Sequence, residues 1–86
     1  MTDSAENRIP VKAPLAGTFY RGPSPDVPPY TEVGQIVEKG QVLALLESMK
    51  VFVKVKSPSK GKIAEILVDN EQVISLDDVL FLMERI

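Results

Sequence analysis

The sequence predicts an all-β protein, a sandwich or barrel in which two similar halves pack together. Three observations predict this class. Apolar residues recur at every second position, and no window of about 11 residues keeps the spacing of an amphipathic helix. Clusters of turn-forming residues interrupt the chain at short intervals. In addition, two segments of the first half recur in the second half.

The internal repeat is defined by two alignments with different offsets. Val11-Lys12-Ala13-Pro14 recurs as Val55-Lys56-Ser57-Pro58, 44 residues later, and the run Val42 to Glu47 recurs as Val79 to Glu84, 37 residues later. The first half therefore carries seven extra residues, 44 minus 37, and they fall in the proline cluster after Arg21. Halves of about 35 residues are too small to close a core alone, so we expect them to pack face to face about a pseudo-twofold axis.

The strands follow from the side-chain pattern. In Val51 to Lys56 three valines alternate with Phe52, Lys54 and Lys56, as in a half-buried strand. The run Gln41 to Glu47 is apolar on both faces, which is typical of a strand covered on two sides, and two later runs resemble it, Lys62 to Val68 and Val79 to Met83. Turn signals separate the strands at Pro14 and Gly17, Gly34, Glu38-Lys39-Gly40, Ser57 to Gly61, Asp69-Asn70, and Ser75 to Asp78.

The predicted core takes apolar residues from every expected strand. Each such side chain contributes about 1.5 to 3 kcal/mol when buried, against roughly 1.5 kcal/mol of conformational entropy for each ordered residue. The expected core residues are Val11, Phe19, Val37, Val42, Leu45, Val53, Val55, Ile63, Ile66, Val73, Val79, Leu80 and Leu82.

Composition excludes several classes of function. The 86 residues suffice for one small domain. The sequence has no cysteine and no histidine, so the chain lacks a disulfide framework, a thiolate nucleophile and the commonest metal ligand. Ten basic and twelve acidic residues give a net charge of -2 with interspersed signs, which argues against a nucleic-acid partner. No apolar run reaches the roughly 18 residues of a membrane span, and the polar start lacks a signal-peptide core. We therefore expect a cytoplasmic protein without a membrane partner.

Lys50 occupies the short seam between the two halves. If the runs Val42 to Glu47 and Val51 to Lys56 are successive antiparallel strands, Ser48, Met49 and Lys50 form a tight hairpin connection that projects Lys50 into solvent. A free lysine has a pKa near 10.4, so at pH 7 only about one molecule in 10³ to 10⁴ presents the neutral amine. Such a lysine is a poor catalyst, and the sequence predicts an attachment point that a separate enzyme acylates.

The residues around this lysine resemble a known family. Glu47-Ser48-Met49-Lys50 resembles the motif of the biotin/lipoyl attachment domains in which the lysine carries biotin through an amide bond. The stretch Gly17-Thr18-Phe19-Tyr20-Arg21, followed by Pro23-Ser24-Pro25-Asp26, is similar to the biotin carboxyl carrier proteins of bacterial and plastid acetyl-CoA carboxylase. The resemblance extends from about Arg8 to Glu84 and includes Val33-Gly34-Gln35.

The resemblance implies a fold and a non-catalytic role. The fold is a flattened barrel of two four-stranded antiparallel sheets, with both termini at one end and the modified lysine at the other. A biotin protein ligase reads the hairpin, including Glu47, Ser48, Met49 and Val51, and attaches biotin to Lys50. A biotin carboxylase then loads carboxylate, and a carboxyltransferase passes it to acetyl-CoA for fatty acid biosynthesis, while the domain serves as the anchor of a swinging arm.

The resemblance also divides the chain and leaves alternatives open. It implies a polar lead at residues 1–8 and a carrier domain at 9–86, with a thumb-like insert at 22–30. Met49 favours biotin, because lipoyl domains usually carry aspartate there, whereas Val51 resembles what lipoyl domains often have after their lysine. A lipoyl carrier of a 2-oxoacid dehydrogenase-like system and an unmodified interaction module of the same fold therefore remain alternatives.

Overall fold

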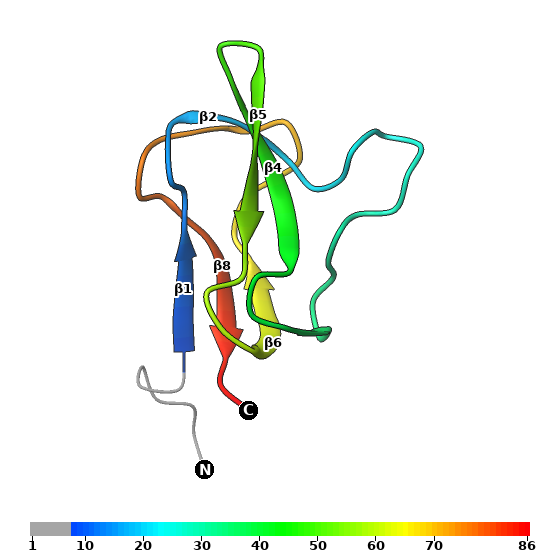
Figure 1. Ribbon diagram of the computed structural model, residues 1–86, viewed down its shortest axis with the longest axis vertical. Helices are drawn as coiled ribbons and strands as arrows, with labels where there is room; N and C mark the ends of the chain where they lie inside the picture. The colour runs from blue at the N-terminus through cyan, green and yellow to red at the C-terminus, as the bar shows by residue number, and fades with distance from the viewer. Residues whose placement is uncertain (1–7) are drawn as a thin grey trace.

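The computed structural model describes residues 8–86, which form strands, turns and loops (Figure 1). Two four-stranded antiparallel sheets have the strand orders β1-β8-β6-β3 and β5-β4-β2-β7, and we call them the β1 sheet and the β5 sheet. The predicted all-β class is therefore confirmed. No helix in residues 8–86 is long and apolar enough to cross a membrane. The strands are β1 (Arg8–Lys12), β2 (Gly17–Tyr20), β3 (Ile36–Val37), β4 (Val42–Ser48), β5 (Val51–Lys56), β6 (Gly61–Ile66), β7 (Val73–Ile74) and β8 (Val79–Glu84).

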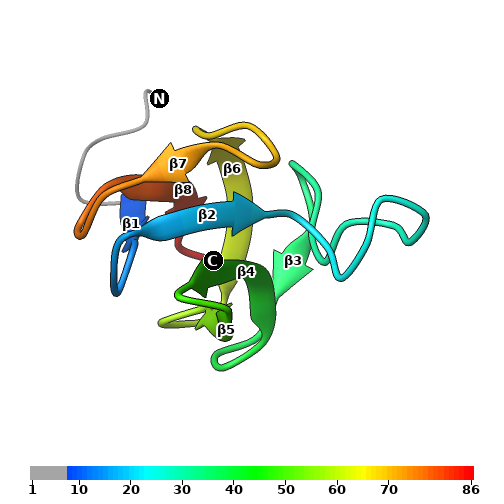
Figure 2. The ribbon, with the colours of Figure 1, turned by 90° about the horizontal axis from the view of Figure 1, so that it is seen from above.

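The two sheets are related by the internal repeat. Replacing β1, β2, β3 and β4 by β5, β6, β7 and β8, and the reverse, converts the order of one sheet into that of the other. The burial pattern of Val42–Glu47 in β4 is the same, residue by residue, as that of Val79–Glu84 in β8. Each sheet takes two strands from each half, so the halves interlock instead of stacking as separate layers (Figure 2). Within the described residues, neither half has a four-stranded sheet of its own, because both sheets are shared between the halves.

The repeat extends to the backbone of the turns. Gly34 and Gly40 have φ angles of 93° and 85°, and the residues 37 positions later, Glu71 and Asp77, both have φ of 70°. The Gly34 amide donates to the Ile63 carbonyl at 2.7 Å, and the equivalent Glu71 amide donates to Phe19 at 2.6 Å. The second half therefore keeps a left-handed turn conformation without the glycine that adopts it most readily.

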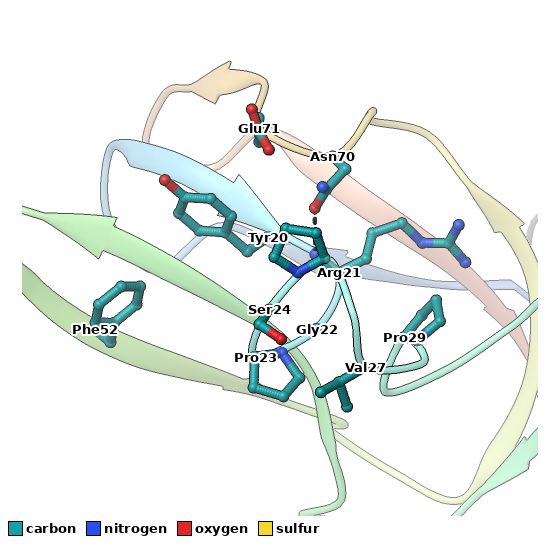
Figure 3. Close-up of a pocket in the computed structure, with 11 residues that line it drawn as sticks. Tyr20, Arg21, Gly22, Pro23, Ser24, Val27, Pro29, Phe52, Asn70 and Glu71 are labelled. Carbon is teal, nitrogen blue, oxygen red and sulfur yellow. Dashed lines mark hydrogen bonds between the residues drawn. The ribbon is translucent and has the colours of Figure 1, made fainter.

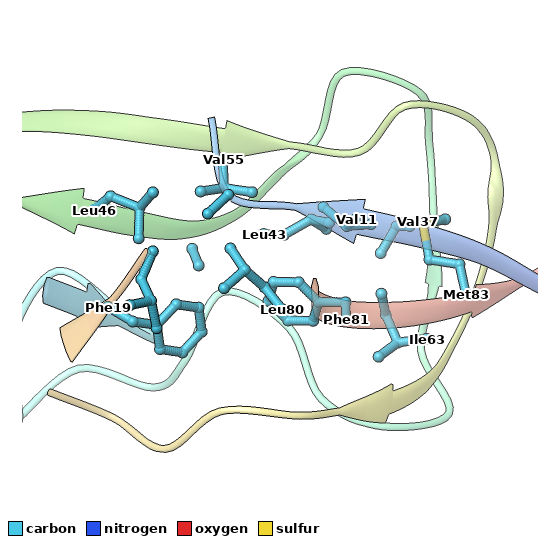
Figure 4. Close-up of a cluster of buried hydrophobic side chains, with 13 residues drawn as sticks. Val11, Phe19, Val37, Leu43, Leu46, Val55, Ile63, Leu80, Phe81 and Met83 are labelled. Carbon is cyan, nitrogen blue, oxygen red and sulfur yellow. The ribbon is translucent and has the colours of Figure 1, made fainter. Parts of the chain in front are cut away.

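The core lies between the sheets and was only partly predicted (Figure 4). Six predicted core residues are buried: Val11, Phe19, Val37, Val55, Ile63 and Leu80. Ile66 is half-buried and packs against the core. The prediction was wrong for Val42, Leu45, Val53, Val79 and Leu82, which are half-buried, and for Val73, which is 78% exposed. The core is completed by Ala13, Leu43, Ala44, Leu46, Ile74, Phe81 and Met83.

Bulges explain part of these errors, most directly Leu82, which period-two counting places on the same face as the buried Leu80. In the pairing of β4 with β5, Val42 faces Lys56 and Ala44 faces Val55, so Leu43 is an extra residue. Leu80 is the equivalent extra residue of β8 in its pairing with β1. A bulge shifts the inside and outside alternation by one residue, so strict period-two counting assigns the wrong face beyond it.

Candidate functional site

Lys50 lies in a two-residue hairpin turn at one tip of the molecule. In the β4 and β5 ladder Ser48 pairs with Val51, which leaves Met49 and Lys50 as the turn. Their φ angles are 52° and 67°, and positive φ at both central residues is the signature of the type I′ turn of tight hairpins. The predicted hairpin is present, but Ser48 is the last residue of β4 and not part of the turn. The turn lies at the end opposite the start of β1 and the C-terminus (Figure 1).

The turn presents both of its side chains to solvent. Met49 is 93% exposed and Lys50 is also exposed, while Val51 at the start of β5 is 60% exposed. Within residues 8–86, no hydrogen bond or ion pair holds the Lys50 ammonium. A left-handed conformation costs a non-glycine residue roughly 1–2 kcal/mol, so the paired strands on both sides must impose it. The Lys50 amine is therefore displayed on a defined backbone and is accessible to another molecule.

Glu47 is held by an aromatic neighbour that the sequence analysis did not assign to the site. The Tyr20 hydroxyl donates a hydrogen bond of 3.1 Å to Glu47 Oε1, and the Tyr20 ring lies 6.0 Å from the Phe52 ring at an interplanar angle of 52°. The hydrogen bond to Glu47 raises the pKa of Tyr20, with smaller contributions from burial and from the negative charge of Glu47, because each disfavours the phenolate. An outward-facing phenylalanine two residues after Lys50 was the available sequence signal.

The proline-rich loop at residues 22–30 contains no strand and extends outward from the end of β2, a strand of the β5 sheet (Figure 2). Its two ends are joined where the Tyr30 amide donates to the Arg21 carbonyl at 2.9 Å. The Arg21 guanidinium donates to the Thr31 carbonyl at 3.1 Å and to Glu32 Oε1 at 3.0 Å. These contacts fix the base of the loop, while residues 23–28 are exposed.

A groove of about 410 Å³ lies between this loop and the aromatic pair (Figure 3). Tyr20 and Phe52 contribute apolar surface, and Asn70 and Glu71 contribute polar surface. The Asn70 side chain accepts a hydrogen bond of 2.9 Å from the Arg21 amide, so the turn after β6 is tied to the start of the loop. Among residues 8–86, no group of three or more potential ligand side chains could hold a metal ion. The site therefore offers the exposed amine of Lys50 on the turn, and a groove that Phe52, two residues further along β5, helps to line.

Comparison with known proteins identifies the family. A family model described as "biotin-requiring enzyme", the biotin/lipoyl model, matches residues 9–83. The chain belongs to this family. Its sequence is 42% identical over 81 residues to the biotin carboxyl carrier protein of acetyl-CoA carboxylase 1 from Arabidopsis thaliana chloroplasts, a match that covers 93% of the chain. It is 52% identical over 64 residues, 74% of the chain, to the biotin carboxyl carrier protein of acetyl-CoA carboxylase from Streptococcus pyogenes.

The chain spans only part of these relatives, 29% of the Arabidopsis protein and 39% of the Streptococcus protein. Among solved structures, a single-chain, multi-domain long-chain acyl-CoA carboxylase matches all of the chain with a TM-score of 0.78 and 26% identity, over 8% of its own length. The Kluyveromyces lactis urea carboxylase matches 95% of the chain with a TM-score of 0.77 at 22% identity, over 7% of its own length, which supports the fold alone. The predicted family resemblance is therefore confirmed.

Proposed function

We propose that the chain is a biotin carboxyl carrier domain, with biotin joined to Lys50, of the acetyl-CoA carboxylase type. The observation that carries this proposal is the placement of Lys50, an exposed amine without a partner among residues 8–86, in a type I′ turn at the end opposite the start of β1 and the end of β8. The relatives named as carriers of acetyl-CoA carboxylase support the choice of system. The domain itself is non-catalytic in this proposal.

The residues of the turn fit covalent attachment of biotin. Amide formation joins Lys50 Nζ to the carboxyl carbon of biotin, while the amine loses a proton and the activating group of the acid leaves. A biotin protein ligase supplies the activated acid and must reach the amine without opposition, which the exposure of Met49 and Lys50 allows. Once attached, biotin would supply the ring that carries the carboxylate. The protein's contribution is to hold the anchor point still while the arm moves.

The tether is the physical basis of the proposed carrier activity. Covalent attachment makes the encounter of the ring with each partner site intramolecular within an assembly, which raises its effective concentration. The partners in this proposal are a biotin carboxylase, which adds the carboxylate, and a carboxyltransferase, which removes it. The opposite placement of Lys50 and the ends of β1 and β8 lets the arm extend away from the point where the chain enters and leaves the domain (Figure 1).

Intact mass after co-expression with a biotin protein ligase tests the proposal. We expect a mass increase of one biotin in the wild type, an avidin signal on a blot, and neither in Lys50→Arg, which keeps the positive charge but cannot form this amide readily. A mass increase of one lipoate in place of biotin would replace the proposal with a lipoyl carrier. Val51 is the residue that would agree with this outcome, because it resembles what lipoyl domains often have after their lysine. An unmodified wild type would indicate an interaction module, and a biotin signal in Lys50→Arg would move the site.

A further inference from the structure

The pseudo-twofold symmetry provides an internal comparison between the outer faces of the two sheets. On the β1 sheet, Arg8 faces Glu84 across the ladder, and Glu65 faces Leu82. Arg8 Nη1 lies 2.8 Å from Glu65 Oε2, and Lys62 Nζ lies 3.7 Å from Glu84 Oε1. Four charges of this face therefore form two ion pairs, whereas Lys12, further along β1, has no ion pair within residues 8–86.

The equivalent face of the β5 sheet has a different chemistry. Phe52 faces Glu47, and Tyr20 faces Leu45, so the Phe52 and Tyr20 rings occupy the positions that the Arg8 and Glu65 ion pair has on the other sheet. Phe52 is 58% exposed. The single carboxylate of these positions, Glu47, already accepts the Tyr20 hydroxyl.

Two lysines follow this aromatic pair along β5, and no carboxylate of residues 8–86 pairs with them. Lys54 and Lys56 follow Phe52 on the outer face of β5, the edge strand of its sheet, and both are exposed. The side-chain ammonium of neither lysine has an ion pair or hydrogen bond to any residue of the described chain. The outer face of β5 therefore presents an exposed aromatic ring followed by two positive charges that have no partner within residues 8–86. A partner surface that fits this face would carry acidic side chains for the lysines and an apolar side chain for the ring.

The position of this face indicates which partner covers it. A strand rises about 3.3 Å per residue, which puts Lys54 about 13 Å and Lys56 about 20 Å from Lys50. A standard protein interface buries about 800 Å² on each partner, a disc of roughly 16 Å radius. Centred on Lys50, this disc contains Lys54, and Lys56 lies about 4 Å beyond its edge, where its long flexible side chain still reaches the rim of the interface. An enzyme that acylates Lys50 must bring its active site to the end of a short four-carbon side chain, so it has to cover the hairpin and the strands beside it. A partner that works on biotin at the end of the longer arm need not approach so closely.

We propose that the outer face of β5, formed by Phe52, Lys54 and Lys56, is the docking surface for an acidic patch of the biotin protein ligase that modifies Lys50. This inference rests on the proposed function. It adds that the ligase recognises the chain beyond the turn, along β5, and only on the β5 sheet. Biotinylation converts the Lys50 ammonium to a neutral amide, so the product has one positive charge fewer on this edge. The ligase would therefore bind the unmodified chain more tightly than its product.

The test is the kinetics of biotinylation by the purified cognate ligase, with a control that the repeat supplies. Lys12 is the equivalent of Lys56 in β1, also exposed but on the outer face of the other sheet. At low salt we expect Lys54→Glu/Lys56→Glu to raise KM about tenfold and Lys56→Glu about threefold, with kcat unchanged. Lys12→Glu should stay within about twofold of the wild type, as should Lys54→Arg/Lys56→Arg. The KM differences should shrink below about twofold in roughly 0.5 M salt.

The possible results separate this inference from the proposed function. A wild-type chain that the ligase does not modify overturns both. A modified wild type with an unchanged KM for Lys54→Glu/Lys56→Glu overturns the docking surface alone, and so does an equal effect of Lys12→Glu or an effect that salt does not reduce. Thermal unfolding of each variant identifies any that has lost the fold. Lys54→Arg/Lys56→Arg keeps both positive charges, so it must keep the wild-type KM if these charges determine binding, and a raised KM in this folded variant overturns the docking surface.

Discussion

Glu71 stands where the first half of the chain has Gly34, in a left-handed turn, and its replacement by glycine should stabilise the protein. Glu71 has φ of 70°, and a left-handed conformation costs a non-glycine residue roughly 1–2 kcal/mol. Glycine removes this cost but adds about 0.5–1 kcal/mol of backbone entropy lost on folding. Glu71→Gly should therefore raise the free energy of unfolding by about 0.5–1 kcal/mol, which is roughly 2–8 °C in melting temperature for a domain of this size.

The matched control is Asp69→Gly, two residues earlier in the same turn. It removes the same charge from an exposed residue whose φ is not positive, so only the entropic cost applies and the free energy of unfolding should fall by about 0.5–1 kcal/mol. Urea denaturation with an unchanged m-value measures both differences. If Glu71→Gly destabilises the chain as much as Asp69→Gly does, the left-handed conformation of Glu71 does not cost the fold stability, and the reasoning is refuted.

Three further substitutions test the packing and electrostatics. Gly17→Ala should lower stability by about 2–3 kcal/mol in urea denaturation, because a Cβ there would collide with the Glu47 carbonyl of β4, and an unchanged midpoint would mean that β2 can move aside. Thr31→Val should raise stability by about 1 kcal/mol in the same assay, since Thr31 is buried and no described residue satisfies its hydroxyl; a loss of stability would contradict this. The raised pKa of Tyr20 means that its neutral form stabilises the fold below its unfolded pKa and that this contribution is lost as pH rises through the folded pKa. The stability advantage of the wild type over Tyr20→Phe should therefore fall above about pH 10, and a difference that does not change with pH would refute the role of this hydroxyl.

The sequence predicted the pairing of the halves better than the direction of individual side chains. The repeat offsets of 44 and 37 align β1 with β5 and β4 with β8, and the two sheets follow the same correspondence. The faces failed where strands were apolar throughout, because Leu43 and Leu80 are bulge residues and nothing in an unbroken apolar run locates a bulge. In the two-residue strand β7 no alternation exists, and Val73 was chosen where Ile74 is buried.

The candidate site shows the same division. The turn at Met49 and Lys50 could be predicted, because it depends on two adjacent strands and on the seam of the repeat. The contact of Tyr20 with Glu47 could not, because it depends on β2 lying beside β4, a pairing between segments 27 residues apart. Local signals predict a hairpin, whereas the neighbours of that hairpin are decided by the order of the strands in the sheet.

The strand order also explains why, in the described chain, this symmetric scaffold closes one of its two equivalent ends with a hairpin turn and not both. The equivalent of the β4 and β5 hairpin is the pairing of β8 with β1, in which Arg8 faces Glu84 as Phe52 faces Glu47. These strands pair like a hairpin, but no turn connects them, because β1 is the first described strand and β8 the last. The symmetry thus gives the molecule two equivalent ends, of which one is closed by Met49 and Lys50 and the other is where the chain enters and leaves. In the proposed function, biotin on Lys50 lies at the closed end, opposite the start of β1 and the end of β8, so the arm extends away from these strand ends.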